Sequence, residues 1–401
     1  MTKADGRVLI AGAGPVGLVL SLSLARRGHR VTVVEKLVDL LDQVRRAGTI
    51  HAATLEMLDD IGLYDRLERR GLVAPLVHYW DRGDPEPVAV FDHAVLAGDT
   101  RFPHALQCDR LKLIEEALKM ASDEELIEIR VGTELVGFAQ DGDSVTAVTE
   151  TADGAREELR GTHLVGCEGA HSVVRKQLGI GFEGFAFPDR TMTLSVMFDF
   201  NSILPYGHRN YILDPAEWAN LFKWTDFWRV VLPADVHADP DALLDDDVIE
   251  AGLQRFHPIG EPYEVVSKSL YTVHQRVAET FRAGRVLLAG DAAHVNSPIG
   301  AMGMNSGIHD AVNLAAKLSS VLRGAGDEVL DRYVRQRRHV AVAHVQAITI
   351  RNKKLMAEAD PQTRRRNRDE LRRAADDPSL AREFLLRASL ISSVREASEI
   401  A

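Results

Sequence analysis

A glycine-rich run near the start of the chain constrains its fold more than any other feature. Residues 12–17 read Gly-Ala-Gly-Pro-Val-Gly and stand between an apolar segment at residues 7–12 and a helical pattern at residues 16–27. A second apolar segment follows at residues 30–36. Short apolar runs on either side of a helix are typical of buried parallel strands. The chain is therefore predicted to open with a strand–helix–strand unit of an α/β fold.

The three glycines of this run have separate physical roles in a dinucleotide site. Gly12 permits a tight turn, Gly14 lets the backbone approach a pyrophosphate, and Gly17 lets the helix pack closely on the strand. The phosphates are expected at the helix N-terminus, where N–H groups and the helix dipole favour negative charge. The predicted contacts are Gly12, Gly14, Pro15, Val16 and Gly17.

A carboxylate stands at the end of the second strand. Glu35 lies 18 residues beyond Gly17, and Lys36 follows it. A carboxylate at this position can accept hydrogen bonds from a ribose and disfavours a 2′-phosphate, so we expect FAD or NAD rather than NADP. Both Glu35 and Lys36 are predicted cofactor contacts. This half of the site does not distinguish FAD from NAD.

A second glycine-rich segment, far along the chain, distinguishes them. An apolar run at residues 286–290 leads into Gly290-Asp291-Ala292-Ala293-His294, and a helical pattern covers residues 307–322. Asp291 could hold a second ribose, while small residues and a helix N-terminus approach the ligand. One dinucleotide held by two distant segments implies a discontinuous domain, which a plain dehydrogenase does not need. The predicted contacts here are Gly290, Asp291, Pro298, Gly303, Met304 and Asn305.

Charge and cysteine content exclude several classes of protein. The chain has 401 residues and a net charge of -11, which argues against a nucleic-acid partner because binding phosphates needs a positive surface. Arginines at residues 364–373 alternate with acids, as on a solvated helix. Cys108 and Cys167 provide neither a disulfide framework nor a multi-cysteine metal site, and both are predicted core residues. No metal, membrane span or signal peptide is expected, and the predicted location is cytoplasmic.

Strand patterns dominate the middle of the chain. Asp141-Gly142 and Asp153-Gly154 separate alternating segments between residues 128 and 166, which predicts hairpins. Residues 191–233 form a second strand-rich region that holds three of the four tryptophans. Its aromatic cluster either fills a core or forms a pocket for a planar ring.

Helical patterns occupy much of the remainder. They cover residues 54–71 and 109–121, with Asp109 as a plausible N-cap of the second. After residue 322 nearly all of the chain is predicted to be helical. These last helices could cover a pocket or form a homodimer interface, and packing against the core is the default expectation.

Three stretches together resemble the single-component FAD-dependent monooxygenases of the para-hydroxybenzoate hydroxylase type. They are GAGPVG with Glu35, GCEGAHSVVRKQLG at residues 166–179, and RVLLAGDAAHVNSPIGAMGMN at residues 285–305. The combination is more specific than any one motif. The resemblance implies an α/β fold, in which a Rossmann-like FAD-binding domain is interwoven with a β-sheet substrate domain and followed by C-terminal helices. The expected bounds are 1–75, 101–180 and 270–335 for the FAD-binding domain, 76–100 and 181–269 for the substrate domain, and 336–401 for the helical region.

The middle stretch departs from the family pattern at one position. The family usually reads Asp-Gly there, at a site associated with both FAD and the nicotinamide coenzyme, whereas this chain has Glu168-Gly169. Glutamate keeps the negative charge, so the resemblance still implies a cofactor contact. His171 and Arg175 are candidates for coenzyme phosphate contacts, and Arg175 is alternatively a charge on a helix surface.

The resemblance assigns further residues to the flavin. Arg46 matches an arginine that contacts the flavin or the mobile loop near it, and Gln107 matches a residue beside FAD. Pro298 matches the proline whose carbonyl lies near the substrate and the flavin ring. The residues predicted to take part in catalysis are Pro298, Gly300 and Arg46.

The implied reaction starts when NADH or NADPH reduces FAD. The reduced flavin then forms a C4a-hydroperoxide with O2, which hydroxylates an aromatic or N-heteroaromatic ring, with a phenol or an aromatic carboxylate favoured. The cofactor carries that chemistry, while the protein excludes water and aims the oxygen. Backbone N–H groups between Gly300 and Asn305 are suited to stabilise negative charge on the flavin.

The substrate contacts are less constrained by the sequence. Arg229, on a predicted strand, could pair with a substrate carboxylate, although an exposed strand arginine is slightly favoured. The predicted substrate contacts are Tyr211, Trp224, Arg229 and Pro298. A base that activates the substrate is not singled out among His51, His78, Tyr211 and His274, and a structural role is favoured for each.

Several other activities use the same cofactor. Epoxidation, oxidative decarboxylation and Baeyer–Villiger oxygen insertion stay open as alternatives. A halogenase is disfavoured because no W-x-W-x-I-P signature occurs, and a disulfide-type flavoenzyme because the two cysteines are far apart. A non-catalytic flavin-binding protein is disfavoured because the glycines and both ribose-type carboxylates are intact.

Overall fold

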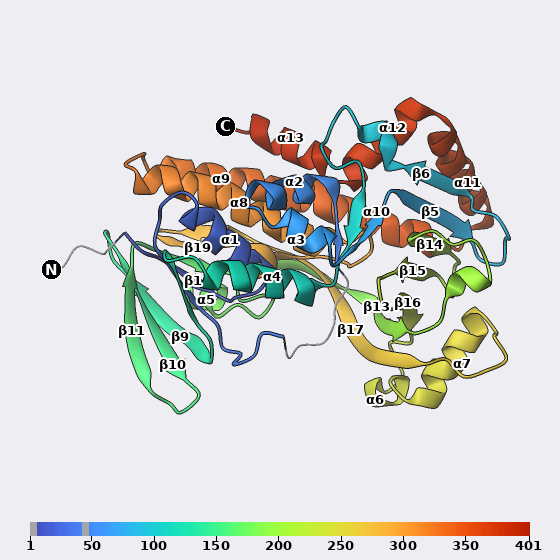
Figure 1. Cartoon of the computed structure of the whole chain (residues 1–401), viewed down its shortest axis with the longest axis horizontal. Coiled ribbons are helices and arrows are strands. Elements are labelled where there is room, and N and C mark those ends of the chain that lie inside the picture. The colour runs from blue at the N-terminus through green and yellow to red at the C-terminus, as the bar shows by residue number, and fades with distance from the viewer. Residues whose placement is uncertain (1–5, 42–47) are drawn as a thin grey trace.

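The computed structural model describes residues 6–41 and 48–401, and Arg46 lies outside these described residues. Two large sheets lie side by side in Figure 1, with long helices above the first and the C-terminal helices above the second. The first sheet has six strands and the second has eight. The predicted α/β fold with interwoven sheets and C-terminal helices is confirmed.

The six-stranded sheet is built from segments of the first 290 residues, in the order β18-β19-β12-β1-β2-β8. All of its pairings are parallel except that of β18 with β19. The apolar runs predicted to be buried strands are buried along their whole length in β1, β2 and β19. The strands are β1 (Val8–Ala11), β2 (Val31–Val34), β8 (Ile127–Arg130), β12 (His163–Gly166), β18 (Arg282–Ala283) and β19 (Val286–Leu288).

Helices pack around this sheet, and α1 is the most buried of them. It contacts both α4 and α8, and its residues from Gly17 to Ala25 are all buried. The predicted N-cap Asp109 accepts a hydrogen bond from Leu111 N–H at 2.9 Å. The helices here are α1 (Pro15–Ala25), α4 (Arg110–Ser122), α5 (Val173–Gln177), α8 (Met302–Leu322) and α9 (Glu328–Val340).

One predicted helix is two helices in the structure. The pattern over residues 54–71 predicts a single helix, but the chain forms α2 (Ala52–Asp60) and α3 (Tyr64–Glu68). Gly62 separates them with φ of +80°, a backbone conformation that interrupts a right-handed helix and favours glycine. The helix predicted from residue 307 is α8, which begins five residues earlier, at Met302.

The eight-stranded sheet runs in the order β20-β17-β13-β16-β15-β14-β5-β6 and is antiparallel except for the β14–β5 pair. The long strand β17 extends from β20, beside the six-stranded sheet, to the far side of the molecule (Figure 1). The strands are β5 (Leu76–Asp81), β6 (Ala89–Asp92), β13 (Phe182–Val196), β14 (Arg209–Leu213), β15 (Ala219–Lys223), β16 (Trp228–Ala234), β17 (Val265–Ala278) and β20 (His294–Val295). Helices α6 (Pro240–Leu243) and α7 (Asp246–Phe256) lie beside this sheet.

Two smaller sheets complete the strands. The predicted hairpins at Asp141-Gly142 and Asp153-Gly154 are confirmed, because β10 pairs antiparallel with both β9 and β11. Their strands are β9 (Thr133–Gln140), β10 (Val145–Thr151) and β11 (Arg156–Gly161). The other sheet joins β3 (Thr49–Ile50), β4 (Leu72–Ala74) and β7 (Ala105–Gln107).

The last part of the chain is helical, as predicted, and packs on the end of the eight-stranded sheet. Helix α10 contacts β14, while α11 and α12 contact β6. Asp81 of β5 accepts hydrogen bonds from Arg364 and Arg368 of α11, so this arginine-rich helix is partly tied to the sheet. The segments are η4 (Ala341–Gln346), α10 (Ala347–Met356), α11 (Pro361–Asp376), α12 (Pro378–Ala388) and α13 (Ile391–Glu399). Among the described residues, none of the helices has both the length and the apolar character that crossing a membrane requires.

Candidate active site

One edge of the six-stranded sheet gathers four segments that the sequence places far apart. Strands β2, β1, β12 and β19 are adjacent and parallel, so their carboxyl ends meet at this edge. Ala11 at the end of β1 is paired with Val34 and Gly166, and Gly166 is paired with Leu288. The segments that follow directly are the glycine-rich run at residues 12–17, Glu35, Glu168-Gly169 and Gly290-Asp291. Ligands of open α/β sheets bind at this kind of edge.

The glycine-rich turn after β1 is tightly built except at one position. Gly12 has φ of +99°, and a Cβ at Gly17 would lie 1.9 Å from the Gly12 carbonyl oxygen. A Cβ at Gly14, in contrast, would meet no protein atom within 4 Å. Gly14 is also the N-cap of α1 and forms no side-chain cap, which leaves the first N–H groups of the helix to a ligand. The open space at Gly14 fits a pyrophosphate on the helix N-terminus.

Glu35 links this turn to the end of β2. Its Oε2 accepts a hydrogen bond from Ala13 N–H at 2.8 Å, and its Oε1 accepts one from Leu37 N–H at 3.0 Å. Each carboxylate oxygen has a second lone pair, so the half-exposed carboxylate can still accept a ribose hydroxyl. The neighbouring Lys36 is exposed.

Glu168, which replaces the usual aspartate, caps the short helix α5. Its Oε1 accepts hydrogen bonds from the Ser172 hydroxyl and from Val174 N–H, both at 2.8 Å. Its Oε2 is buried and has no hydrogen-bond partner within residues 6–41 and 48–401. Burial raises the pKa of this carboxyl group, against the hydrogen bonds that favour the charged form. Gly169 follows with φ of +85°.

Arg175 is buried, so the alternative of a helix-surface charge is wrong. Its guanidinium donates 2.8 Å hydrogen bonds to the carbonyl oxygens of Ala170 and Ala292 and lies 3.8 Å from the centre of the Phe182 ring. These bonds tie the loop after β12 to the loop after β19. His171 is exposed nearby in sequence.

The loop after β19 is held by a buried charge network that sequence patterns did not reveal. Asp310 of α8 is fully buried, and its Oδ2 accepts hydrogen bonds from Gly290 N–H at 3.0 Å and from His294 Nε2 at 2.8 Å. Its Oδ1 accepts a 2.6 Å hydrogen bond from Arg337 of α9. Burial opposes ionisation, but the charges and hydrogen bonds of Arg337 and His294 lower the pKa of Asp310 to about 2. No sequence pattern singles out Asp310, because the buried face of α8 also contains the polar residues Asn305, Ser306 and His309.

The start of α8 is pinned to the segment around β3. Asn305 accepts a hydrogen bond from His51 N–H at 2.9 Å and donates to the carbonyl oxygens of Thr49 and Ala301 at 2.8 and 2.6 Å. His51 Nε2 lies 2.8 Å from the Gly300 carbonyl oxygen and therefore carries a proton. Gly300 has φ of +97° and Ala301 has φ of +57°. Sequence patterns did not indicate this role of His51.

The remaining predicted cofactor residues are Gln107, Asp291, Pro298, Gly303 and Met304. Gln107 of β7 is buried and accepts a 2.5 Å hydrogen bond from the Thr49 hydroxyl, which places it beside Asn305 through a shared partner. Pro298 and Asp291 are exposed, whereas Gly303 and Met304 are half-buried in the first turn of α8. Gln107 therefore lies near the start of α8, which holds Gly303, Met304 and Asn305.

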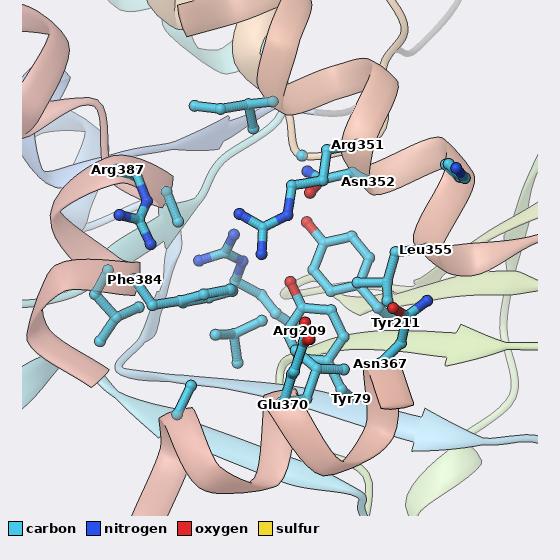
Figure 2. A pocket seen from close by; sticks show the side chains of 18 of the residues that line it. Tyr79, Arg209, Tyr211, Arg351, Asn352, Leu355, Asn367, Glu370, Phe384 and Arg387 are labelled. Atoms are coloured by element: carbon cyan, nitrogen blue, oxygen red, sulfur yellow. The ribbon is translucent and has the colours of Figure 1, made fainter. Parts of the chain in front are cut away.

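A cavity of about 260 Å³ adjoins this loop on the side of the eight-stranded sheet. Strands β5 and β14 form one wall, and helices α10, α11 and α12 form the other (Figure 2). Gly300 and Met302 connect the cavity to the predicted flavin edge. The C-terminal helices thus cover a pocket, which was one of the roles considered for them.

Several polar groups line this cavity, including Asn367 and Glu370 of α11. Figure 2 shows the guanidinium groups of Arg209 and Arg351 and the hydroxyl groups of Tyr79 and Tyr211 directed toward the same space. The two tyrosine rings stack with centroids 5.2 Å apart and an interplanar angle of 19°. Tyr211 is a predicted substrate contact, whereas Tyr79, Arg209 and Arg351 were missed.

Arg209 dominates the electrostatics of the cavity. Its side chain is only 4% exposed, and no hydrogen bond or ion pair to its guanidinium is found within the described part of the chain. Burial and the nearby charge of Arg209 together lower the pKa of His51 to about 3. His51 is therefore neutral at physiological pH. A buried cation of this kind is stabilised by an anionic ligand.

The other predicted substrate residues lie elsewhere. Arg229 is on strand β16, as expected, but it is fully buried, so the favoured interpretation as an exposed strand arginine is wrong. Its guanidinium lies 5.3 Å from the Phe227 ring, which stacks with Trp224. The residues lining the cavity do not include Arg229, Trp224, His78, His274 or Pro298.

The aromatic-rich region contributes to both a core and a pocket. Trp80, Tyr206 and Trp228 belong to a buried cluster between the sheet and α7. Tyr211, Trp218 and Trp224 belong to another cluster, together with residues of the C-terminal helices. The aromatic residues therefore fill a core in one part of the sheet and, through Tyr211, line the cavity in another. Both interpretations of this region hold.

Comparisons with known proteins agree on the family. The family model described as "FAD binding domain" matches residues 5–348. The chain is 32% identical over 395 residues to the para-nitrophenol 4-monooxygenase of Pseudomonas sp. (strain WBC-3), covering 96% of each chain. The crystal structure of p-nitrophenol 4-monooxygenase from Pseudomonas putida DLL-E4 matches with a TM-score of 0.91 and 32% identity, over 97% of this chain and 99% of that one.

A further solved structure contains the cofactor. The ternary complex of aklavinone-11 hydroxylase with FAD and aklavinone matches with a TM-score of 0.78 and 29% identity, over 89% of this chain and 71% of that one. The relatives are named as hydroxylating monooxygenases, which agrees better with ring hydroxylation than with the alternative flavin reactions. The chain therefore belongs to the single-component FAD-dependent aromatic monooxygenases, enzymes that use FAD as cofactor and NADH or NADPH as reductant.

Proposed function

We propose that this enzyme hydroxylates a small, single-ring phenol that carries a nitro or carboxylate group, and that the substrate binds in the cavity of Figure 2. The observation that carries the proposal is the buried guanidinium of Arg209, which faces the cavity and has no acidic partner among the described residues. The printed name of the para-nitrophenol relative, matched over 96% of both chains, supports the same class.

The size of the cavity favours one ring over a fused ring system. Its volume of about 260 Å³ lies below the roughly 300–1,000 Å³ typical of sites for drug-sized ligands. The stacked rings of Tyr79 and Tyr211 offer flat apolar surfaces for such a ring, and Phe384 lines the same cavity. A planar aromatic substrate fits these surfaces.

The polar groups orient the ring. A nitro or carboxylate oxygen accepts hydrogen bonds from Arg209, and Arg351 supplies a second cation from α10. Burial raises the pKa of Tyr79, so its hydroxyl group stays protonated and donates a hydrogen bond rather than acting as a base. Helices α10 to α12 exclude water from the ring, and His51 holds the Gly300 carbonyl in position.

The FAD contacts form the second part of the proposal. Bound FAD supplies the activated oxygen, and we expect its phosphates at Gly14 and the start of α1, with a ribose at Glu35. The loop at residues 298–305 then lies between the flavin ring and the cavity. The open space at Gly14 and the contact of Gly300 and Met302 with the cavity support this arrangement. The division into domains at the bounds given above belongs to this proposal.

The source of the oxygen and the cellular context also belong to this proposal. We expect the oxygen to come from O2. A cytoplasmic enzyme is expected because Cys108 and Cys167 are both free thiols. A homodimer is one assembly that the exposed faces of the chain permit, and sedimentation of the FAD-loaded protein would measure it.

Substrate-dependent coenzyme oxidation tests the proposed activity. FAD-loaded protein is incubated with NADH or NADPH and with p-nitrophenol, p-hydroxybenzoate or unsubstituted phenol, and products are identified. Nitrite indicates oxygen insertion at the carbon that bears the nitro group, whereas a nitrocatechol indicates insertion beside the hydroxyl group. Oxidation of coenzyme without any hydroxylated product from this panel would contradict the proposed substrate class.

Arg209→Met separates substrate recognition from flavin chemistry. Loss of a charge-assisted hydrogen bond costs about 1.5–3 kcal/mol, so KM for p-nitrophenol and p-hydroxybenzoate should rise roughly 10- to 150-fold. Turnover of unsubstituted phenol and the flavin content should change little. Arg209→Lys should restore part of the binding, and Arg255→Met, at an exposed arginine paired with Glu217, serves as the control. An equal rise in KM for all three phenols would contradict the assignment of Arg209.

A further inference from the structure

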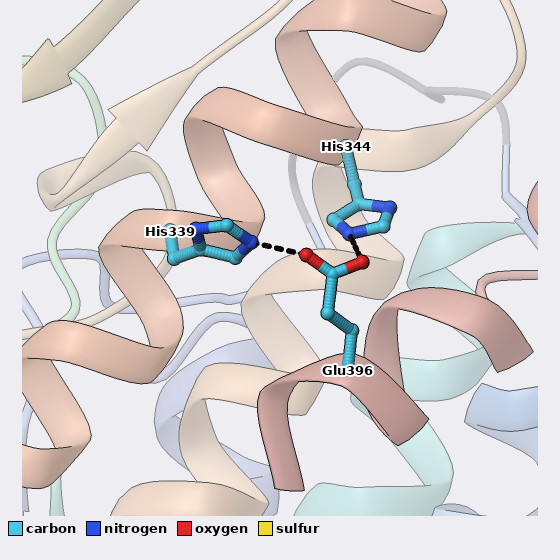
Figure 3. A group of neighbouring side chains, drawn as sticks. All are labelled: His339, His344 and Glu396. Atoms are coloured by element: carbon cyan, nitrogen blue, oxygen red, sulfur yellow. Dashed lines mark hydrogen bonds and ion pairs between the residues drawn. The ribbon is translucent and has the colours of Figure 1, made fainter. Parts of the chain in front are cut away.

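A cluster outside the substrate cavity has no part in the reaction proposed above. His339 near the end of α9, His344 in η4 and Glu396 in α13 point toward one another in Figure 3. His339 Nε2 lies 2.5 Å from Glu396 Oε1, and His344 Nε2 lies 2.9 Å from Glu396 Oε2. One potential ligand atom from each residue lies within 4.8 Å of the others. Three potential ligands therefore converge from two parts of the chain, the continuous stretch of α9 and η4 on one side and α13 on the other.

The backbone between the two histidines is unusual in a way that brings them together. His339 and His344 are five residues apart, which on an α-helix of 3.6 residues per turn separates the side chains by about 140°. The segment Ala341–Gln346, which contains His344, is π-helical, with wider turns that bring residues i and i+5 closer to the same face. π-Helical turns are rare and occur often at functional sites. The wide turn is thus what aligns the two imidazoles on Glu396.

We propose that His339, His344 and Glu396 bind a divalent transition-metal ion of the Zn²⁺ class. Two imidazole nitrogens and one carboxylate form a typical donor set for zinc, and a water molecule completes the fourth position. The side chains of His339 and Glu396 are 39% and 45% exposed, so an ion and its water can enter from solvent. His344, at 14%, provides the most buried ligand.

The donor atoms must separate slightly to accept the ion. In a tetrahedral site with bonds of about 2.1 Å, neighbouring ligand atoms lie roughly 3.4 Å apart. The present N···O distances of 2.5 and 2.9 Å therefore increase by about 0.5–0.9 Å. Small rotations of two half-exposed side chains supply this movement, while the helices stay in place.

The metal site has a structural consequence for the substrate cavity. Segment η4 continues directly into α10, and α13 follows α12, and both α10 and α12 line the cavity. Arg332 and Gln336 of α9 already hold the carbonyl oxygen of Ile400 at the end of α13. A metal ion at the cluster therefore fastens the two helical parts of the cavity wall to each other.

Titration calorimetry on tag-free, FAD-loaded protein tests the site. Zn²⁺ should bind with a stoichiometry of one to the cluster and raise the melting temperature, whereas Mg²⁺, which prefers oxygen ligands, should not. His339→Ala, His344→Ala and Glu396→Gln should each weaken Zn²⁺ binding by at least about tenfold. His237→Ala, at an exposed histidine outside the cluster, should leave it unchanged.

Two outcomes would overturn the proposal. One is the absence of saturable Zn²⁺ binding to the native protein. The other is Zn²⁺ binding that all three variants leave intact, which would mean that the three residues only hydrogen-bond to one another. If a variant does not fold, anomalous diffraction at the zinc edge from crystals of the native protein decides the question, because the peak must lie between these three side chains.

Discussion

Replacing Asp310 with asparagine is the most informative test of how the flavin edge is built. The carboxylate is fully buried and accepts hydrogen bonds from Gly290 N–H, His294 and Arg337. Asparagine keeps the shape but removes the charge that compensates the buried Arg337. If the amide nitrogen of asparagine faces Gly290 N–H or His294 Nε2, two donors meet and the hydrogen bond is lost. Both effects destabilise the folded state and loosen the loop that leads to Asp291.

The size of the effect can be estimated in two ways. Breaking a buried ion pair by removing one partner costs about 3–5 kcal/mol. Independently, lowering the pKa of Asp310 from 3.8 to about 2 corresponds to about 2 kcal/mol at neutral pH. With an unfolding entropy of about 2.1 cal/mol/K per residue over 401 residues, a loss of about 2–5 kcal/mol lowers Tm by about 2–6 °C.

The pH dependence of this effect has a definite sign. Because the pKa of Asp310 is lower in the folded state, its stabilisation is complete above the unfolded value of 3.8 and is lost as pH falls toward about 2. The difference in Tm between the native enzyme and Asp310→Asn should therefore be constant from pH 5 to 8 and shrink below pH 4.

Thermal unfolding and flavin absorbance measure both consequences. The variant should melt earlier and retain less FAD after gel filtration. Asp331→Asn, at an exposed aspartate on α9 that pairs with Arg282, should shift stability by no more than about 0.5 kcal/mol. In a double-mutant cycle, Arg337→Met should lessen the cost of Asp310→Asn. A variant as stable and as yellow as the native enzyme, or strictly additive effects in the cycle, would refute the reasoning.

Further predictions concern the glycine-rich turn at residues 12–17 and the cavity wall. Gly17→Ala should destabilise even the FAD-free protein by more than about 1 kcal/mol, because its Cβ would lie 1.9 Å from the Gly12 carbonyl oxygen. Gly14→Ala should leave the FAD-free protein unchanged, because its Cβ meets no protein atom within 4 Å. It should weaken FAD binding at least about tenfold in fluorescence titrations, because the pyrophosphate is proposed to bind in that space; equal effects of the two variants would contradict this. Asp81→Asn should loosen α11, which Arg364 and Arg368 tie to β5, at a cost of about 1–3 kcal/mol. The readout is a higher ratio of H2O2 to hydroxylated product, and an unchanged ratio would show that this tie does not seal the cavity.

The arrangement at the carboxyl edge of the six-stranded sheet was largely predictable because the residues there follow buried strands. Gly12, Glu35 and Gly290 each stand directly after an apolar run, and the parallel pairing of those runs brings them to one edge. Local patterns of this kind depend on residues that are close in sequence. Even the Asp109 cap followed from two neighbouring positions.

The cavity was not predictable by the same means. Arg209 lies in a strand whose five residues are all buried, where a pattern indicates only core. Its counterpart Arg351 comes from a helix about 140 positions later, and no local signal relates the two. Arg229 was placed on a strand correctly but expected to be exposed, because the covering of β16 on both faces is a tertiary feature.

The two walls of the cavity differ in how they connect to the rest of the fold. The strand wall, with Tyr79 and Tyr211, is continuous with the sheet whose long strand β17 reaches the flavin edge. Helices α10, α11 and α12, which form the other wall, follow these strands in the sequence. Exchanging residues on these helices should retune which ring is accepted without disturbing the cofactor. An engineer who wants a new specificity from this scaffold would begin at Asn352 of α10 and Phe384 of α12, which both line the cavity, and not at the glycines.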